Sequence, residues 1–462
     1  MKNNNKSNND LGSGSVAKLL FRLALPAIIA QLVNVLYNIV DRMFIGRLDN
    51  GELAMAGIGV SFPIIMLISA FSALIGNGGA PLAAIKMGQK DNDGAEKILG
   101  NSFSLLIIIS VILTMVFSIF KEPILMAFGA SNVTIEYAAS YLGVYLIGTI
   151  FVQLSLGINP YINTQGFAKY GMITVMIGAV INIILDPILI FGLGMGVKGA
   201  ALASVIGQFG SAVWALKFLF GNKSILKIRK KYLIPDVKIA ASIMALGISP
   251  FIMQSTESLV MISLNSQLLR YGGDLAVGAM AIMNSVMQII IMPLLGLTMG
   301  AQPILSYNYG AGNMDRVGKT FKLLIASCVT YTMIMGGSIL LFPEFYVGLF
   351  NDKPELVQIT VSSMRIFFIG TTIFGGQIAC QQTFLSLGKA KISLILALLR
   401  KVLLLVPLIF ILPVFFEDKL IGTLAAEPVA DIVATLITVT YFIIFYRRLM
   451  KENRSDSEGQ IV

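Results

Sequence analysis

The sequence predicts an all-α membrane protein of twelve transmembrane helices, arranged as two similar bundles of six. Composition, long uncharged runs and an internal repeat support this fold class. Hydrophobic residues make up 56% of the 462-residue chain and charged residues only 13%, with a mean hydropathy of +0.83. Because soluble domains carry about a quarter charged residues, this chain cannot cover a water-exposed surface with polar groups.

The uncharged runs have the length of membrane-crossing helices. A helix needs about 20 apolar residues to cross the hydrocarbon core, and uncharged runs extend from Leu53 to Ile85 and from Leu275 to Met314. These runs are continuous and not alternating, which favours helices over a barrel. The expected spans are 19–41, 53–77, 98–120, 134–157, 170–192, 198–220, 239–264, 275–299, 321–343, 359–385, 392–416 and 420–446.

The basic residues support twelve spans with both ends in the cytoplasm. With a cytoplasmic amino end, twenty-one Lys and Arg residues fall on inner connections and seven on outer ones, as the positive-inside rule requires. This distribution explains the net charge of +10 without a nucleic-acid partner. We expect a disordered tail over 1–18, a first lobe over 19–222, a basic linker over 223–238 that faces anionic lipid, a second lobe over 239–446 and a tail over 447–462.

The two halves repeat each other at an offset of 222 residues. Each half has an even number of spans, so both insert in the same direction, and transporters of this design open a cavity between their halves. A receptor, a membrane enzyme or a passive channel does not need such duplication. The matching positions include Gly78 with Gly300, Pro81 with Pro303, Gly88 with Gly310, and Ile147-Gly148-Thr149 with Ile369-Gly370-Thr371; Pro26 matches Pro250 after a two-residue slip.

An enzymatic function is not expected. The chain has no histidine, no metal-binding motif and no constellation of a nucleophile with its base, and both cysteines lie in apolar runs. We therefore expect no cofactor, and any proton chemistry must be performed by carboxylates.

Asp41 is the first candidate for such chemistry, because ionisable groups within the membrane are costly and usually functional. Asn34, Tyr37 and Asn38 precede it at helical spacing and form a polar stripe with it. The alternative is an interfacial carboxylate paired with Arg42.

Asp186 is the second candidate. It shares a helix face with Asn182, and Pro187 frees a backbone carbonyl in the preceding turn. On the next helix, Ser204 adds a hydroxyl group, and these oxygen atoms suit a bare cation. The alternatives are a kink held by local hydrogen bonds and, for Ser204, helix packing. Neither Asp41 nor Asp186 has an acidic counterpart in the second half, and two nearby carboxylates suit reversible protonation or Na⁺ exchange.

The second half contains further charges whose default explanation is mutual ion pairing. A substrate contact by Glu257 or Asp431 is the alternative. We also expect the cavity to include Gln31 and Gln153 beside the polar stripe. The charges considered are Glu257, Glu427, Asp431, Arg365, Arg400 and Lys401.

Three segments resemble the multidrug and toxic compound extrusion (MATE) family over nearly the whole chain, from about residue 19 to 446. They are Leu23 to Pro26 followed by Tyr37-Asn38-Ile39-Val40-Asp41-Arg42-Met43-Phe44-Ile45-Gly46; Asn182 to Pro187 followed by Gly196-Val197-Lys198-Gly199-Ala200-Ala201; and Ala426-Glu427-Pro428-Val429-Ala430-Asp431. The third is similar to the MepA-like bacterial branch.

The resemblance implies a V-shaped exporter with the fold of the wider MOP superfamily, in a bacterial plasma membrane. Such an antiporter exchanges inward H⁺ or Na⁺ for amphipathic, often cationic drugs, and we expect it to act as a monomer in contact with lipid. Carried over by position, the cation site is Asp41, Asn182, Asp186 and Ser204, with Na⁺ compatible with the first three. Helix 1 would bend near Pro26. The alternative is a lipid-linked saccharide flippase of related fold, which requires a strongly cationic cavity.

Overall fold

The computed structural model describes residues 11–351 and 353–458, and all of their regular elements are helices. This confirms the predicted all-α fold class. Residues 1–10 of the predicted amino-terminal tail lie outside the described residues. The tail ends earlier than expected, because α1 already begins at Val16.

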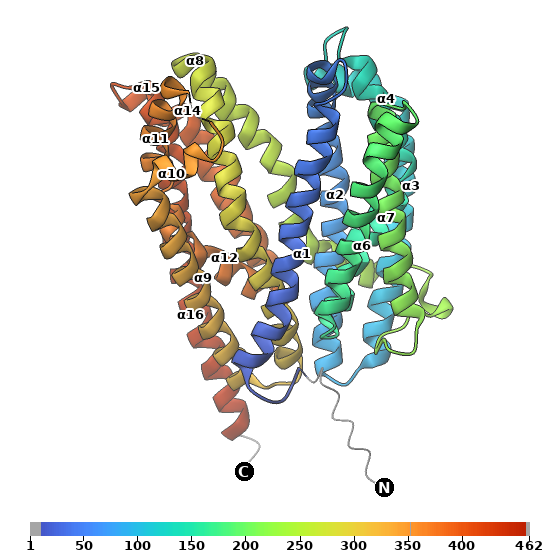
Figure 1. Cartoon of the computed structure of the whole chain (residues 1–462). Helices are drawn as coiled ribbons and strands as arrows, with labels where there is room; N and C mark the ends of the chain where they lie inside the picture. Colours follow the sequence, from blue (N-terminus) through green and yellow to red (C-terminus); the bar gives the residue numbers. More distant parts are fainter. Residues whose placement is uncertain (1–10, 352, 459–462) are drawn as a thin grey trace.

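The elements fall into two sequential groups that lie side by side in Figure 1. The first group contains α1 (Val16–Ile45), α2 (Gly51–Gly88), α3 (Asn92–Ala127), α4 (Ile135–Ile147), α5 (Thr149–Thr164), α6 (Ala168–Pro187), the π-helix η1 (Ile188–Gly192) and α7 (Val197–Phe220). After the short 3₁₀-helix η2 (Lys230–Tyr232), the second group contains α8 (Val237–Gly310), α9 (Met314–Leu341), α10 (Pro343–Gly348), α11 (Pro354–Phe367), α12 (Thr371–Ser386), α13 (Ala390–Leu398), the π-helix η3 (Leu399–Leu405), α14 (Val406–Phe415), α15 (Lys419–Leu424) and α16 (Ala426–Glu458).

The helices provide up to twelve membrane crossings in the described part of the chain. Nine helices are long and apolar enough to cross a membrane, and two bent pairs raise the number to eleven. The 74-residue α8 has non-helical backbone angles at Gly273. Because 74 residues of helix would measure about 110 Å, far more than the hydrocarbon thickness of about 30 Å, α8 is two crossings, and the eleven become twelve.

Both bent crossings break at equivalent positions of the repeat. The α4–α5 pair bends by 59° beside Gly148, and the α11–α12 pair bends by 49° beside Gly370. The sequence predicted each pair as a single span, 134–157 and 359–385, without indicating a break. Hydropathy cannot detect such breaks, because the residues on both sides are equally apolar.

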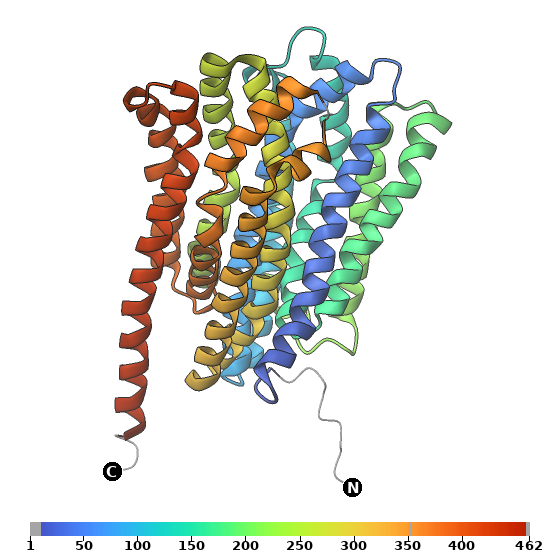
Figure 2. The ribbon, with the colours of Figure 1, turned by 60° about the vertical axis from the view of Figure 1, so that its left-hand side comes forward.

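The helices also extend beyond the predicted apolar spans. Backbone hydrogen bonds hold a helix together in water as well as in lipid, so a helix does not stop where its apolar residues stop. Figure 2 shows this for α16, which projects past its neighbours toward the described end of the chain. Its 33 residues correspond to about 50 Å, so the segment from residue 447, predicted as a tail, continues the helix to Glu458.

The two groups approach closely at the end where both termini lie (Figure 1). There α2 contacts α8 without intervening side chains. A Cβ added to Gly88 would lie 2.8 Å from the Ala311 nitrogen, and one added to Gly310 would lie 2.8 Å from the Ile85 Cα. These two contacts are equivalent in the repeat. Glycines therefore seal this end of the molecule by backbone packing.

The connection between the groups is fastened to the first group. The Gln165 side-chain oxygen accepts hydrogen bonds from the N–H groups of Ile225 (2.7 Å) and Leu226 (2.9 Å). Nearby, Arg229 pairs at 2.5 Å with Glu96, whose side chain is buried. The predicted basic linker is thus held against the helices by its backbone as well as its charges.

Candidate functional site

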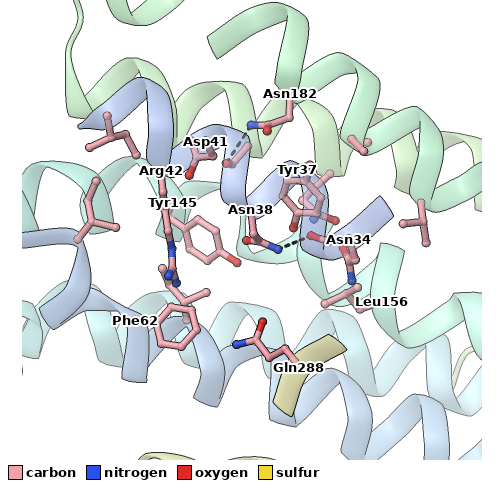
Figure 3. Close-up of a pocket in the computed structure, with 18 of the residues that line it drawn as sticks. Asn34, Tyr37, Asn38, Asp41, Arg42, Phe62, Tyr145, Leu156, Asn182 and Gln288 are labelled. Carbon is pink, nitrogen blue, oxygen red and sulfur yellow. Dashed lines mark hydrogen bonds between the residues drawn. The ribbon is translucent and has the colours of Figure 1, made fainter. Parts of the chain in front are cut away.

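A cavity of about 510 Å³ lies between the first group and α8. This volume is within the range of small-molecule sites. Helices α1, α2 and α4 to α7 line one side, and α8 contributes Met261, Ala281, Asn284, Ser285 and Gln288. Figure 3 shows Gln288 opposite Phe62 and the polar face of α1. Both groups therefore contribute walls to one cavity.

The polar stripe predicted on α1 faces this cavity. Asn34, Tyr37, Asn38 and Asp41 all line it (Figure 3). The Asn38 amide nitrogen donates to the Asn34 carbonyl at 2.6 Å, which fixes that side chain along the helix. The Arg42 guanidinium lies 5.5 Å from the centre of the Phe62 ring, a cation–π contact.

Asp41 and Asp186 meet at the inner edge of the cavity. Their carboxyl groups lie within hydrogen-bonding reach of each other. Asp186 is fully buried behind the cavity wall, and Asn182 is 2% exposed. The Asn182 amide nitrogen donates to Asp186 Oδ1 and to Ser204 Oγ, both at 3.3 Å. The structure therefore brings together all four residues proposed for the cation site.

Local structure explains how α6 presents Asp186. Pro187 ends α6, and the chain continues directly as the π-helix η1. A π-turn replaces the regular hydrogen bonds that proline cannot support. The four-residue spacing of Asn182 and Asp186 keeps both side chains on the face toward α1 and α7.

Three oxygen atoms at this site find no hydrogen-bond donor among the described residues. They are Asp41 Oδ1, Asn182 Oδ1 and Asp186 Oδ2, and all three are buried. Buried polar atoms normally have a partner, and two adjoining carboxylates repel unless a proton or cation lies between them. Two carboxylate oxygens and one amide oxygen are ligands that suit H⁺ or Na⁺.

Four predicted cavity residues do not line this cavity. Gln31 donates to the Met299 sulfur at 3.1 Å. Gln153 is buried and donates to the Ile68 carbonyl at 2.7 Å, while its side-chain oxygen accepts from Ser72 at 3.0 Å.

The other two, Glu257 and Asp431, belong to ion pairs in the second group. Glu257 pairs with Lys401, and Asp431 with Arg400, so the default ion-pairing interpretation describes both.

Sequence reasoning missed two tyrosines of the cavity wall. Tyr141 and Tyr145 line it with rings stacked 6.3 Å apart, and Ser204 lines the same cavity. Their four-residue spacing was a detectable signal. Hydropathy hid it, because tyrosine counts as one more residue of an apolar span.

Comparison with known protein families places the chain clearly. The MatE family model matches twice, over residues 26–188 and 250–411. The two matches begin at Pro26 and Pro250, the equivalent prolines of the repeat.

Curated relatives match over almost their full length. The chain is 26% identical over 441 residues to the multidrug export protein MepA of Staphylococcus haemolyticus, covering 94% of each chain. It is 25% identical over 426 residues to MepA of Staphylococcus aureus strain NCTC 8325, covering 91% of this chain and 93% of the relative.

Solved structures share the fold. An outward-facing multidrug resistance MATE transporter of the MOP superfamily superposes with a TM-score of 0.89 at 24% identity, covering 96% of this chain and 99% of that one. A MATE structure in a straight conformation gives 0.88 at 25% identity, covering 96% and 98%. The fold of the described residues is thus the one that the sequence motifs predicted.

Proposed function

This chain belongs to the MatE family, and we propose that it is a secondary active antiporter that exports amphipathic, often cationic drugs in exchange for H⁺ or Na⁺. The observation that carries this proposal is the juxtaposition of a drug-sized cavity with the unneutralised carboxyl pair of Asp41 and Asp186. Placing both features on one helix gives the cation a direct way to influence the substrate cavity. Helix α1 supplies Asp41 to the pair and the polar stripe to the cavity.

The coupling follows from charge. When a proton or Na⁺ occupies the Asp41–Asp186 pair, the repulsion between the carboxylates is relieved and α1 can settle against α6. The cation then favours one conformation of the transporter by as much as its affinity for the two conformations differs. Pro26 removes one backbone hydrogen bond from α1 and provides a place where this helix can bend.

The cavity supports a cationic or neutral substrate over an anionic one. Among its lining residues, Arg42 is the basic group, and its guanidinium is stacked on Phe62. A lipid-linked saccharide flippase needs several cations for a diphosphate. The basic candidates of the second group instead pair with acids: Arg400 with Glu427 and Asp431, Lys401 with Glu257, and Arg365 with Glu344.

The cellular setting is also a proposal. We place the protein in a bacterial plasma membrane as a monomer, with both termini and the basic linker in the cytoplasm against anionic lipid. The excess of Lys and Arg on the inner connections supports this orientation. We propose drugs, the coupling cation and lipid as its partners and no nucleic acid. We propose no catalytic activity.

Efflux by proteoliposomes tests the proposal. We expect Asp41→Asn and Asp186→Asn each to reduce gradient-driven efflux at least tenfold, because neither amide can release and rebind the cation. Asp49→Asn is the matched control, since Asp49 is an exposed carboxylate eight residues further along. Wild-type efflux from both aspartate variants, at equal protein levels, would refute the site.

The coupling ion requires a separate comparison. Efflux is measured with a Na⁺ gradient at fixed pH, and then with a pH gradient without Na⁺. Asn182→Ala distinguishes the two ions further, because Asn182 Oδ1 can be a ligand of Na⁺ but is not needed to hold a proton on a carboxylate. A Na⁺-coupled protein should lose Na⁺ affinity in this variant, whereas an H⁺-coupled one should retain efflux.

A further inference from the structure

A buried cluster of one basic and two acidic side chains lies in the second bundle, separate from the Asp41–Asp186 pair of the first. The Arg400 guanidinium donates from Nε to Asp431 Oδ1 at 2.7 Å and from Nη2 to Glu427 Oε1 at 3.1 Å. Exposure of these residues is 9%, 1% and 8% respectively. Two carboxyl groups therefore share one guanidinium in a water-poor environment.

The surrounding elements do not supply a second cation to this trio within the described residues. Lys401 pairs with Glu257 of α8, and Arg365 of α11 pairs with Glu344 at the surface. Lys419 of α15 donates to the Pro413 carbonyl. Helices α12 and α14 contain no charged residue, and Cys380 is the titratable group of α12. With both carboxyl groups ionised, the trio would carry one uncompensated negative charge.

Several buried polar atoms on α16 and the adjoining α12 have no hydrogen-bond partner among the described residues. Asp431 Oδ2 has no hydrogen-bond partner among the described residues. Thr435 lies one turn further along α16, and its hydroxyl is also unpartnered and buried. On the adjoining α12, the Thr371 hydroxyl and the Gln377 side-chain oxygen are also buried and unpartnered. An added Cβ at Gly370 would meet Asp431 Cβ at 2.8 Å, so the start of α12 lies directly beside this carboxyl group.

We propose that the second bundle contains a proton-binding site of its own, in which Asp431 and Glu427 hold one proton between them beside Arg400. The proton makes the trio neutral and turns one carboxyl group into a hydrogen-bond donor. Thr435 lies one turn from Asp431, and Thr371 follows Gly370, which lies against Asp431. Their unpartnered oxygens, with that of Gln377 further along α12, can accept from this donor or from water next to it. A proton fits better than a metal cation, because Arg400 already occupies the space beside both carboxyl groups.

The position of the cluster connects this proton to the seam between the bundles. Arg400 and Lys401 are consecutive residues of the π-helix η3, a conformation often found at functional sites. Lys401 binds α8 through Glu257 and through the Met253 carbonyl at 3.1 Å. The same half of α8 packs against α2, since Gly247 and Leu74 are in backbone contact. A role of this proton in transport rests on the proposed antiport, whereas proton binding itself does not.

Infrared spectroscopy of the purified full-length protein tests proton binding without any transport. A protonated buried carboxyl group gives a C=O band that is separate from those of carboxylates and amides. We expect Asp431→Asn and Glu427→Gln each to remove the same component of this band at neutral pH, because one carboxylate facing one guanidinium needs no proton. Asp41→Asn removes a different component, which separates the first-bundle site from this one.

Matched variants keep the result interpretable. Thr438→Val, one turn beyond Thr435 on α16, should leave the carboxyl band intact, and Thr435→Val should shift its frequency by removing an acceptor. If Asp431→Asn fails to fold, Glu427→Gln gives the same test. The proposal is overturned if the band is unchanged in both acid variants, or if adding Na⁺ at constant pH removes their shared component from the wild type. If Asp41→Asn loses efflux but keeps the band component that Asp431→Asn removes, both the proposed cation site and the second-bundle proton site are supported.

Discussion

Replacing Gly88 or Gly310 by alanine should force open the seam that closes one end of the molecule. The two glycines occupy equivalent positions of the repeat, and each faces backbone atoms of the other bundle. Gly88 of α2 lies against the turn at Tyr307 and Ala311, and Gly310 of α8 lies against Ile85. Backbone cannot move aside as a flexible side chain can, so the helices themselves must separate.

The size of the effect follows from the distances. The added Cβ atoms would meet the carbonyl oxygens of Tyr307 and Ile85 first, at less than the 2.8 Å that separates them from Ala311 N and Ile85 Cα. Non-bonded carbon pairs rest at about 3.5–4.0 Å. The seam must therefore widen by at least about 1 Å. Overpacking of this kind costs about 1–3 kcal/mol. The cost applies to the conformation in which this end is closed, so the alternative conformation gains about 5- to 150-fold in relative population.

Distances between two spin labels can measure this shift. Asn92 and Lys319 are exposed and lie near the starts of α3 and α9, one on each bundle. Cysteines at these positions can be labelled selectively once the buried Cys328 and Cys380 are replaced. Gly88→Ala and Gly310→Ala should each move the distance distribution toward longer values, and drug efflux should fall as the two conformations become unequally populated.

Gly337→Ala in α9 provides the control, because an added Cβ there meets no atom within 4 Å and Gly337 does not line the cavity. Gly337 lies inside α9 whereas Gly88 is the last residue of α2, so the control gains at least as much helix propensity. A widening seen in Gly88→Ala and not in the control therefore reports packing. The reasoning fails if Gly88→Ala and Gly310→Ala give the same distance distributions and efflux rates as Gly337→Ala.

Two further predictions concern the linker and its junction with α8. Gln165→Leu removes the acceptor for the N–H groups of Ile225 and Leu226. Leaving the buried Leu226 donor unpaired costs about 1–3 kcal/mol, so trypsin should cut faster at Lys227 and Arg229. Gln165→Glu keeps the acceptor and should resist cleavage, and equal cleavage of both variants would contradict the assignment. Hydrogen bonds from the Lys238 and Ile239 N–H groups hold the pKa of Asp236 below its ordinary value. These hydrogen bonds therefore stabilise the folded protein at pH values above the ordinary pKa. The stabilisation is lost as the pH falls through the lower pKa that Asp236 has in the folded protein. Asp236→Asn should flatten the fall of the apparent melting temperature below about pH 4. The exposed Asp274 is the control, and Asp274→Asn should leave this fall unchanged. An unchanged fall in Asp236→Asn would argue against this cap.

The sequence alone determined the membrane character, the helical class and the duplicated plan. These features depend on composition and on periodic patterns along the chain, which the lipid environment translates directly into helices. It also selected Asp41 and Asp186, because an acid in an apolar run is conspicuous wherever the helix packs. Asn182 was selected by its four-residue spacing from Asp186, and the family resemblance joined Ser204 to the same site. The matched positions Gly148 and Gly370 were visible as well, although nothing local showed that the chain bends there.

Only the tertiary structure decided which of the polar candidates share a site. Gln153 and Asp431 are as conspicuous in the sequence as Asp41. In the structure, however, Gln153 hydrogen-bonds the Ile68 carbonyl of a neighbouring helix, and Asp431 pairs with Arg400. The rotation of each helix about its axis and the neighbour it meets determine this outcome. Both depend on packing between segments far apart in the chain, as where Gly88 meets Tyr307. A pattern along one helix shows which residues share a face, but the opposing helix determines whether that face becomes a cavity, an ion pair or a seam.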